Sequence, residues 1–187
     1  MWIRLNRPEA MNSLTPEVLL GIDQALNEAQ ERADVITVVL TGTGRAFCAG
    51  ADLKYVKTQA GESGTHGFLD SVLATMNRIN RFPKPVIAAL NGITLAGGLE
   101  LVLCCDLVLA ARSTKIGDAH ANFGLLPGGG GSVRLPRAIG PARAKYLLFT
   151  GDFVAASELV AAGLVNQVVD DEQLESATQA VADKIAT

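Results

Sequence analysis

The stretch KPVIAALNGITLAGGLELVLCCD, Lys84 to Asp106, decides the fold of this chain. Prolines before VIAAL disfavour a helix, so these apolar residues are predicted to form a buried strand. The glycine-bearing residues NGITLAGG are predicted to be a loop, and LELVLCCD a helix that starts at Gly97 or Gly98. A further strand, DLVLAAR, is expected from Asp106. Strands and helices that alternate in this way favour a parallel or mixed sheet with crossover helices.

The same alternation continues on both sides of this stretch. Towards the N-terminus we expect a short strand WIRLN, a helix capped by Thr15 that runs to about Arg32, a strand from Val35 to Gly42, a loop TGTGRAFCAGADL and a helix from about Gly67 to Phe82. Towards the C-terminus we expect a third strand over DLVLAAR, a loop from Lys115 to Gly131, helices near Val133 to Ile139, Pro141 to Phe149 and Ala155 to Ala162, a strand VNQVV and a last helix from about Asp171. No repeat or low-complexity linker separates these elements, so residues 1–187 are predicted to form a single domain.

Composition restricts the partners of the chain. It has 187 residues, of which 49% are hydrophobic, and its 16 basic and 19 acidic side chains give a net charge of −3. Without a basic block, nucleic acid is not expected as a partner. The start lacks the features of a signal peptide and the most apolar stretch is interrupted by Glu100 and Asp106, so no membrane partner is expected. Cys48, Cys104 and Cys105 form no CxxC pattern, which argues against a metal site and favours a reducing, cytoplasmic location.

Two glycine loops follow buried strands and lead into helices. In open α/β sheets the crevice at the carboxyl ends of the strands is the usual ligand site. Glycine lets a backbone N–H approach a ligand closely, and the first turn of a helix offers unpaired donors. Neither GxGxxG nor GxxxxGK[ST] occurs, so the loops are not nucleotide fingerprints. Glu100 lies three residues after Gly97, which places its carboxylate near the same helix mouth.

Several segments together resemble one family. The runs are NRPEAMNSL, GRAFCAGADLK, KPVIAALNGITLAGGLELVLCCD, FGLLPGGGGSVRLPRAIG and AASELVAAGLVNQVV, and they cover nearly the whole chain in the expected order. They are similar to the signature segments of the enoyl-CoA hydratase/isomerase, or crotonase, superfamily. The resemblance implies an α/β fold, a spiral of repeated ββα units, an acyl-CoA thioester substrate and a homotrimer or hexamer. It implies no cofactor beyond the CoA of the substrate, and it leads us to expect a shortened N-terminal strand and no C-terminal helical segment.

The resemblance also implies site residues. The thioester oxygen would lie between the backbone N–H groups of Ala51 and Gly97, an oxyanion hole. In comparable sites, loss of one such donor costs roughly 2.7–4 kcal/mol of barrier. Ala51, Asp52, Leu53 and Lys54 would bind substrate, with Lys54 a partner for the CoA phosphates. Glu100 matches the first catalytic glutamate of the hydratases.

The second catalytic position holds a histidine in this chain. Counting back from Pro127 places His120 where hydratases carry their second glutamate, and Asp118 could orient its imidazole. The resemblance makes hydration of a 2-enoyl-CoA in fatty acid metabolism the leading hypothesis, and a histidine can move protons near neutral pH. The alternatives are an isomerase, a hydrolase of a thioester or C–C bond, and a non-catalytic acyl-CoA-binding or scaffold protein. The acyl group is not predicted, because the family pocket, here 57–68, varies in conformation.

Overall fold

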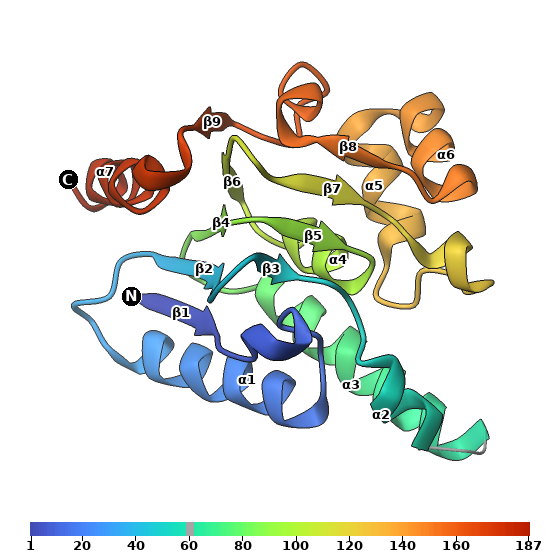
Figure 1. Ribbon diagram of the computed structural model, residues 1–187. Helices are drawn as coiled ribbons and strands as arrows, with labels where there is room; N and C mark the ends of the chain where they lie inside the picture. Colours follow the sequence, from blue (N-terminus) through green and yellow to red (C-terminus); the bar gives the residue numbers. More distant parts are fainter. Residues whose placement is uncertain (59–61) are drawn as a thin grey trace.

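The computed structural model describes residues 1–58 and 62–187, and its strands form two sheets (Figure 1). The first sheet contains, in spatial order, β1 (Trp2–Leu5), β2 (Val38–Gly42), β4 (Val86–Leu90), β6 (Leu107–Ala111) and β9 (Gln167–Val169). All its neighbouring strands are parallel. The second sheet contains β3 (Ala46–Cys48), β5 (Ile93–Leu95), β7 (Lys115–Gly117) and β8 (Phe153–Ala155), of which only β8 is antiparallel to its neighbour. The predicted α/β class with a largely parallel sheet is confirmed.

The helices lie around these sheets. They are α1 (Pro16–Glu31), α2 (Leu53–Thr58), α3 (Glu62–Asn80), α4 (Gly97–Val102), α5 (Gly131–Ile139), α6 (Pro141–Thr150) and α7 (Leu174–Ala186), with 3-10 turns η1 (Pro8–Ala10), η2 (His120–Phe123), η3 (Ala156–Leu159) and η4 (Asp171–Gln173). Helix α1 packs against α3, α5 against α6, and α7 against β4 and β6 (Figure 1). None of the helices in the described residues is long and apolar enough to cross a lipid bilayer.

The chain repeats one unit three times. A strand of the first sheet is followed by a short strand of the second sheet and then by a helix, as in β2, β3 and α2, in β4, β5 and α4, and in β6, β7 and η2. Glycine allows the chain to turn from β2 into β3 and from β4 into β5. A Cβ at Gly42 would lie 2.6 Å from the Phe47 carbonyl oxygen, and one at Gly92 would lie 2.9 Å from the Arg45 carbonyl carbon. The ββα repetition that the resemblance implies is therefore present.

The sequence analysis missed the second sheet. The three segments predicted as loops contain β3, β5 and β7, because strands of three residues show no periodicity and pair only with residues far away in the chain. The predicted helix from Ala155 to Ala162 is also wrong, since β8 ends at Ala155 and only the 3-10 turn η3 follows. Its alanine-rich sequence favours a helix, but the segment lies between β8, which pairs with β7, and a turn at Gly163, which has φ 88°.

Other predicted boundaries are displaced by a few residues. The strand predicted from Val35 begins at Val38, the helix predicted from Gly67 begins at Glu62, and the last helix begins at Leu174 after a 3-10 turn. The start of α1 is confirmed, because the Thr15 hydroxyl accepts a hydrogen bond from the Val18 N–H.

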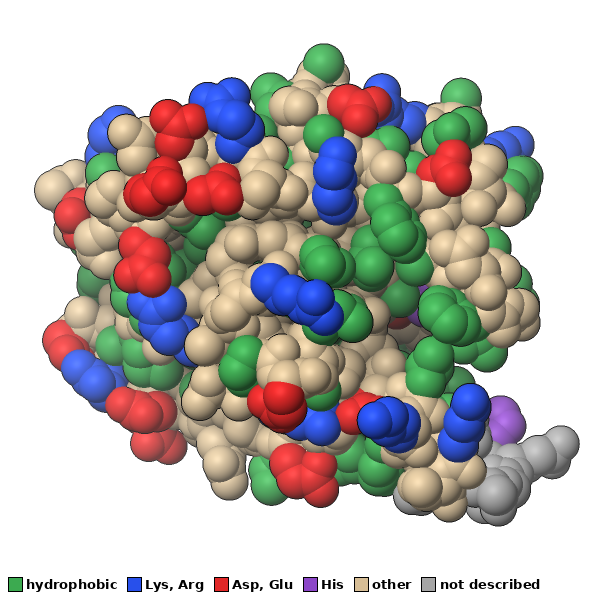
Figure 2. All heavy atoms as spheres, viewed as in Figure 1, with side chains coloured by type: hydrophobic (Ala, Val, Ile, Leu, Met, Phe, Trp, Pro, Cys, Tyr) green, Lys and Arg blue, Asp and Glu red, His purple; other side chains and the backbone are tan. Residues whose placement is uncertain are grey.

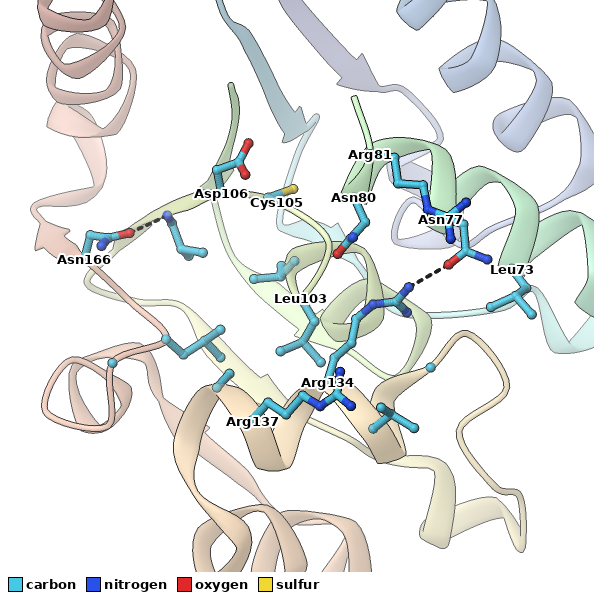
Figure 3. Close-up of a pocket in the computed structure, with 17 residues that line it drawn as sticks. Leu73, Asn77, Asn80, Arg81, Leu103, Cys105, Asp106, Arg134, Arg137 and Asn166 are labelled. Carbon is cyan, nitrogen blue, oxygen red and sulfur yellow. Dashed lines mark hydrogen bonds between the residues drawn. The ribbon is translucent and has the colours of Figure 1, made fainter. Parts of the chain in front are cut away.

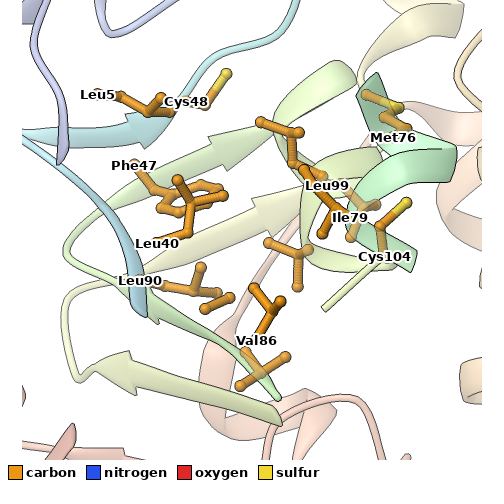
Figure 4. Packing of buried hydrophobic residues seen from close by; sticks show 14 of the residues in the cluster. Leu5, Leu40, Phe47, Cys48, Met76, Ile79, Val86, Leu90, Leu99 and Cys104 are labelled. Atoms are coloured by element: carbon orange, nitrogen blue, oxygen red, sulfur yellow. The ribbon is translucent and has the colours of Figure 1, made fainter. Parts of the chain in front are cut away.

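The main core fills the space between the sheets, α3 and α4 (Figure 4). Phe47 and Leu99 are almost completely buried there, and burying side chains of this size contributes about 1.5–3 kcal/mol each. The thiols of Cys48 and Cys104 are free and belong to the same cluster, where burial raises the pKa of the Cys48 thiol to about 12. The core therefore fixes β3, which leads to Ala51, and α4, which contains Gly97 and Glu100.

Candidate active site

The turn from β5 into α4 brings a carboxylate and a backbone donor together. Ala96, the residue between the two elements, has φ 49° and ψ −118°, a conformation that is costly for a residue with a side chain. Gly97 begins α4, so its N–H has no acceptor within the helix. Glu100 follows one turn later and is 2% exposed. The strained turn thus holds a helix mouth and a buried carboxylate in fixed positions.

The N–H groups of Ala51 and Gly97 lie next to each other. A Cβ at Gly97 would lie 3.6 Å from the Ala51 nitrogen and 3.3 Å from the Gly50 Cα. Leu14 donates to the Gly50 carbonyl and accepts from the Asp52 N–H, which leaves the intervening Ala51 N–H outside this pairing. In the described part of the chain neither N–H donates to a protein acceptor. Two adjacent donors are thereby available to one ligand oxygen.

The Glu100 carboxylate is held from one side. Its Oε1 accepts a hydrogen bond from the Gly131 N–H at 2.8 Å. Burial raises the pKa of Glu100, and the N–H of Gly131 and the charge of His120 offset only part of that effect. A carboxylate with a raised pKa is a stronger base than one exposed to water, which suits proton abstraction.

His120 faces Glu100 from the other side of the site. Its Nε2 lies 3.9 Å from Glu100 Oε2, and its Nδ1 lies 3.0 Å from Asp118 Oδ1. Burial lowers the pKa of His120, but the hydrogen bond to Asp118 and the charges of Asp118 and Glu100 outweigh it, so the pKa is raised. The predicted contact between Asp118 and His120 is confirmed. Because Asp118 accepts at Nδ1, the Nε2 atom is the one that faces the reaction space.

Two cavities meet at these groups. The inner cavity, of about 130 Å³, is lined by Glu100, Gly97 and His120 and by apolar side chains, namely Leu14, Val56, Phe68, Val72, Leu125 and Leu126. The outer cavity, of about 680 Å³, shares Ala51, Leu53, His120 and Leu125 with it. Part of the segment expected to shape the acyl pocket, residues 59–61, lies outside the described residues. Glu100 and His120 thus lie where an apolar cavity opens into a larger, more polar one.

The predicted substrate-binding segment lines the outer cavity. Leu53 and Lys54 are on its wall, and the Lys54 side chain is exposed. Asp52 also lines it, but its carboxylate accepts from Arg7 at 3.0 Å and from the N–H groups of Lys54 and Tyr55. Asp52 therefore caps α2 and anchors Arg7. The sequence analysis did not single out Arg45, an exposed guanidinium on the same wall, since nothing in its local sequence marks it.

The described residues include no group of three His, Cys, Asp or Glu side chains placed as metal ligands. The arrangement offers instead a buried base, an imidazole held by a carboxylate, and two backbone donors beside an apolar cavity. Such a set can abstract a proton, deliver another and stabilise an oxyanion.

A spiral of ββα units with this set of groups at its helix mouths defines a crotonase-type protein. The sequence model for enoyl-CoA hydratase/isomerase matches residues 1–187. A crotonyl-CoA hydratase of Syntrophomonas wolfei is 40% identical over 183 residues, which are 97% of this chain and 70% of that protein. A short-chain-enoyl-CoA hydratase of Clostridium acetobutylicum is 36% identical over 99% of this chain and 71% of its own length.

Solved structures agree with these sequence relatives. The crystal structure of an enoyl-CoA hydratase from Bacillus anthracis superimposes with a TM-score of 0.95 at 42% identity, covering 99% of this chain and 72% of that one. The chain belongs to the enoyl-CoA hydratase/isomerase family.

Proposed function

We propose that the chain is an enoyl-CoA hydratase, a lyase that adds water across the double bond of a 2-enoyl-CoA. The observation that carries this proposal is the pair Glu100 and His120, whose reactive atoms face each other at 3.9 Å beside the N–H groups of Ala51 and Gly97. The relatives named as hydratases, at 36% and 40% identity over nearly the whole chain, support the same reaction.

In the proposed reaction Glu100 takes up one proton and His120 gives up another. The thioester oxygen accepts hydrogen bonds from Ala51 and Gly97. The Glu100 carboxylate takes a proton from water while the water oxygen bonds to the β-carbon, and the double-bond electrons move to the thioester oxygen as an enolate. The His120 imidazolium then gives its Nε2 proton to the α-carbon, and the enolate returns to the thioester. Proton transfer from Glu100 to His120, directly or through one water, restores the starting state.

The surroundings favour this chemistry energetically. Charge develops on the thioester oxygen beside an apolar cavity, where fixed backbone donors need not reorganise. Each donor is worth roughly 2.7–4 kcal/mol of barrier in comparable sites. In the outer cavity the exposed cations Arg45 and Lys54 suit the phosphates of CoA, and no cofactor beyond this CoA is needed for the proposed steps.

The contact between Asp118 and His120 also favours a second candidate, a hydrolase of a thioester or C–C bond. An imidazole held by a carboxylate can activate water for attack on a carbonyl. Crotonyl-CoA in isotopically labelled water separates the candidates by product mass. Addition of water without cleavage supports the hydratase, chain cleavage supports the hydrolase, and an unchanged mass with a moved double bond supports an isomerase. Tight binding without any product would support a non-catalytic acyl-CoA-binding protein and overturn the proposal.

We further propose that the chain assembles as a homotrimer or hexamer. Large hydrophobic side chains remain exposed on η2 and α6, including Phe123 at 63% and Phe149 at 75%. Figure 2 shows hydrophobic side chains gathered on the right side of the visible face, where Figure 1 places these elements. Exposed apolar patches of this kind often mark interfaces. Sedimentation tests the assembly, and a monomer at all concentrations contradicts it. We also propose that the protein acts in fatty acid metabolism in the cytoplasm. The free thiols support the location, because they suit a reducing compartment.

A further inference from the structure

A third cavity, of about 670 Å³, lies on the far side of the loop that holds Glu100. Gly130 lines this cavity, whereas Gly128 and Gly129 of the same loop line the inner cavity of the site. Its walls come from α3, the end of α4, α5 and the turn before β9, and they carry several arginine and asparagine side chains (Figure 3). The loop Gly128 to Gly131 therefore forms a thin partition between this cavity and the catalytic groups.

Arg134 joins this partition to a helix. Its Nη1 donates to the Gly129 carbonyl at 2.7 Å, and its Nη2 donates to Asn77 Oδ1 on α3 at 2.8 Å (Figure 3). The guanidinium also lies against Gly130, where a Cβ would be 3.1 Å from its central carbon. One side chain from the first turn of α5 thus links the loop to α3.

On its other face the same loop contacts Glu100. The Gly131 N–H donates to Glu100 Oε1 at 2.8 Å, and a Cβ at Gly129 would lie 2.8 Å from Glu100 Oε2. Gly130 has φ 99°, which glycine adopts without strain. Four consecutive glycines have no side chains that could fix the loop, and glycine is the most flexible residue. Gly131 begins α5, so the position of its N–H depends on how the first turn of α5 and the loop before it are held.

We propose that Arg134, braced by Asn77, is a positioning residue that holds the glycine loop so that the Gly131 N–H orients the Glu100 carboxylate. The inference rests on the proposed hydration for its kinetic part only. Arg134 does not line the cavities that hold Glu100 and His120, and it acts through the loop.

Two consequences distinguish this role from general stabilisation. Without the Gly131 donor, Glu100 loses a hydrogen bond that lowers its pKa, so that pKa rises further. His120 then loses part of the neighbouring negative charge that raises its own pKa, so the pKa of His120 falls. A residue that merely stabilises the fold would change the melting temperature without moving these titrations.

The test uses two variants and a matched control in the full chain. Arg134→Met removes the brace, and Asn77→Leu loosens it while leaving the arginine charge in place. Arg137→Met removes a charge from the same cavity, three residues further along α5, where the exposed side chain makes no hydrogen bond within the described residues. We expect kcat for crotonyl-CoA to fall roughly 10–100-fold in Arg134→Met, less in Asn77→Leu, with KM nearly unchanged. Arg137→Met should behave like the wild type.

The pKa of His120 in the ligand-free protein, measured by NMR, provides a readout that needs no activity. It should fall in Arg134→Met and Asn77→Leu and stay constant in Arg137→Met. If both brace variants are folded and keep the wild-type kcat and His120 pKa, the inference is overturned. If the wild type does not hydrate any enoyl-CoA but the His120 pKa still falls in the brace variants, the positioning role stands and the proposed function fails.

Discussion

Replacing Asp118 with asparagine tests the proposed proton donor most directly. Asparagine keeps the shape of the side chain but removes the negative charge beside His120 Nδ1, which lies 3.0 Å from Asp118 Oδ1. The side chains of Asp118 and His120 are only 2% and 12% exposed, respectively, so water screens their interaction little. The variant should therefore lose most of the effect by which Asp118 raises the pKa of His120.

The size of the effect follows from this hydrogen bond. A hydrogen bond to a charged group contributes about 1.5–3 kcal/mol, and one pKa unit corresponds to about 1.4 kcal/mol. The pKa of His120 should therefore fall in Asp118→Asn. At a pH above the His120 pKa of both proteins, loss of an interaction of that size should lower the imidazolium fraction, and with it kcat, about 10- to 100-fold, and the difference should shrink at lower pH. Activity should partly return as the pH is lowered towards the pKa of Glu100.

The assay combines kinetics with a titration of both histidines. Hydration of crotonyl-CoA is followed by loss of the enoyl absorbance over a pH series, and NMR follows the imidazole signals in the ligand-free protein. His66, the second histidine of the chain, is exposed on α3 and serves as an internal reference. Asp170→Asn, which removes a carboxylate from an exposed ion pair with Arg112, is the control. An unchanged His120 pKa in Asp118→Asn, or an unchanged kcat, would refute the role of the imidazolium as proton donor.

Three further predictions concern the base, the oxyanion hole and the pH profile. Glu100→Gln keeps an acceptor for the Gly131 N–H but removes the base, so kcat should fall about 10²- to 10⁴-fold. Because burial raises the pKa of Glu100 in the folded protein, the charged carboxylate destabilises the fold at a pH above that pKa. In thermal unfolding, Glu100→Gln should therefore melt at a higher temperature than the wild type near neutral pH and at the same temperature in acid. Gly97→Ala places a Cβ 3.6 Å from the Ala51 nitrogen and should lower kcat roughly 10²- to 10³-fold with the circular dichroism spectrum retained. For the wild type, kcat should rise with pH through the Glu100 pKa, above 4.5, and fall through the His120 pKa, above 6.5; a profile without the alkaline limb would contradict this assignment.

The parts of the fold that follow from local sequence were predictable. The prolines before VIAAL disfavour a helix and so predict the strand. Helix α1 begins after the Thr15 cap, because a hydroxyl followed by a proline favours a helix start in any surroundings. The spacing of Glu100 from Gly97 likewise places the carboxylate near the helix mouth by helical geometry alone. These features depend on residues that are neighbours in the chain.

Features that depend on distant pairing were not predictable. The second sheet is made of three-residue strands whose pairing partners lie tens of residues away. The hydrogen bond from Gly131 to Glu100 joins residues 31 apart, and the bond from Arg134 to Asn77 joins residues 57 apart. No local sequence pattern predicts such contacts. The sequence therefore indicated the candidate site residues but not the contacts that fix their positions.

The surroundings of His120 explain how a histidine could fill the proposed role of proton donor. Burial alone would keep an imidazole neutral, and a neutral imidazole whose Nδ1 donates to a carboxylate has no proton on Nε2 to deliver. Asp118, which is itself almost completely buried, supplies the negative charge that reverses this preference. Glu100 and the imidazolium then form an acid and a base of opposite charge at 3.9 Å, whereas two carboxylates at that distance would repel each other unless one were protonated. In the proposed mechanism His120 can thus serve as the proton donor only together with Asp118, so we expect the two residues to act as one unit.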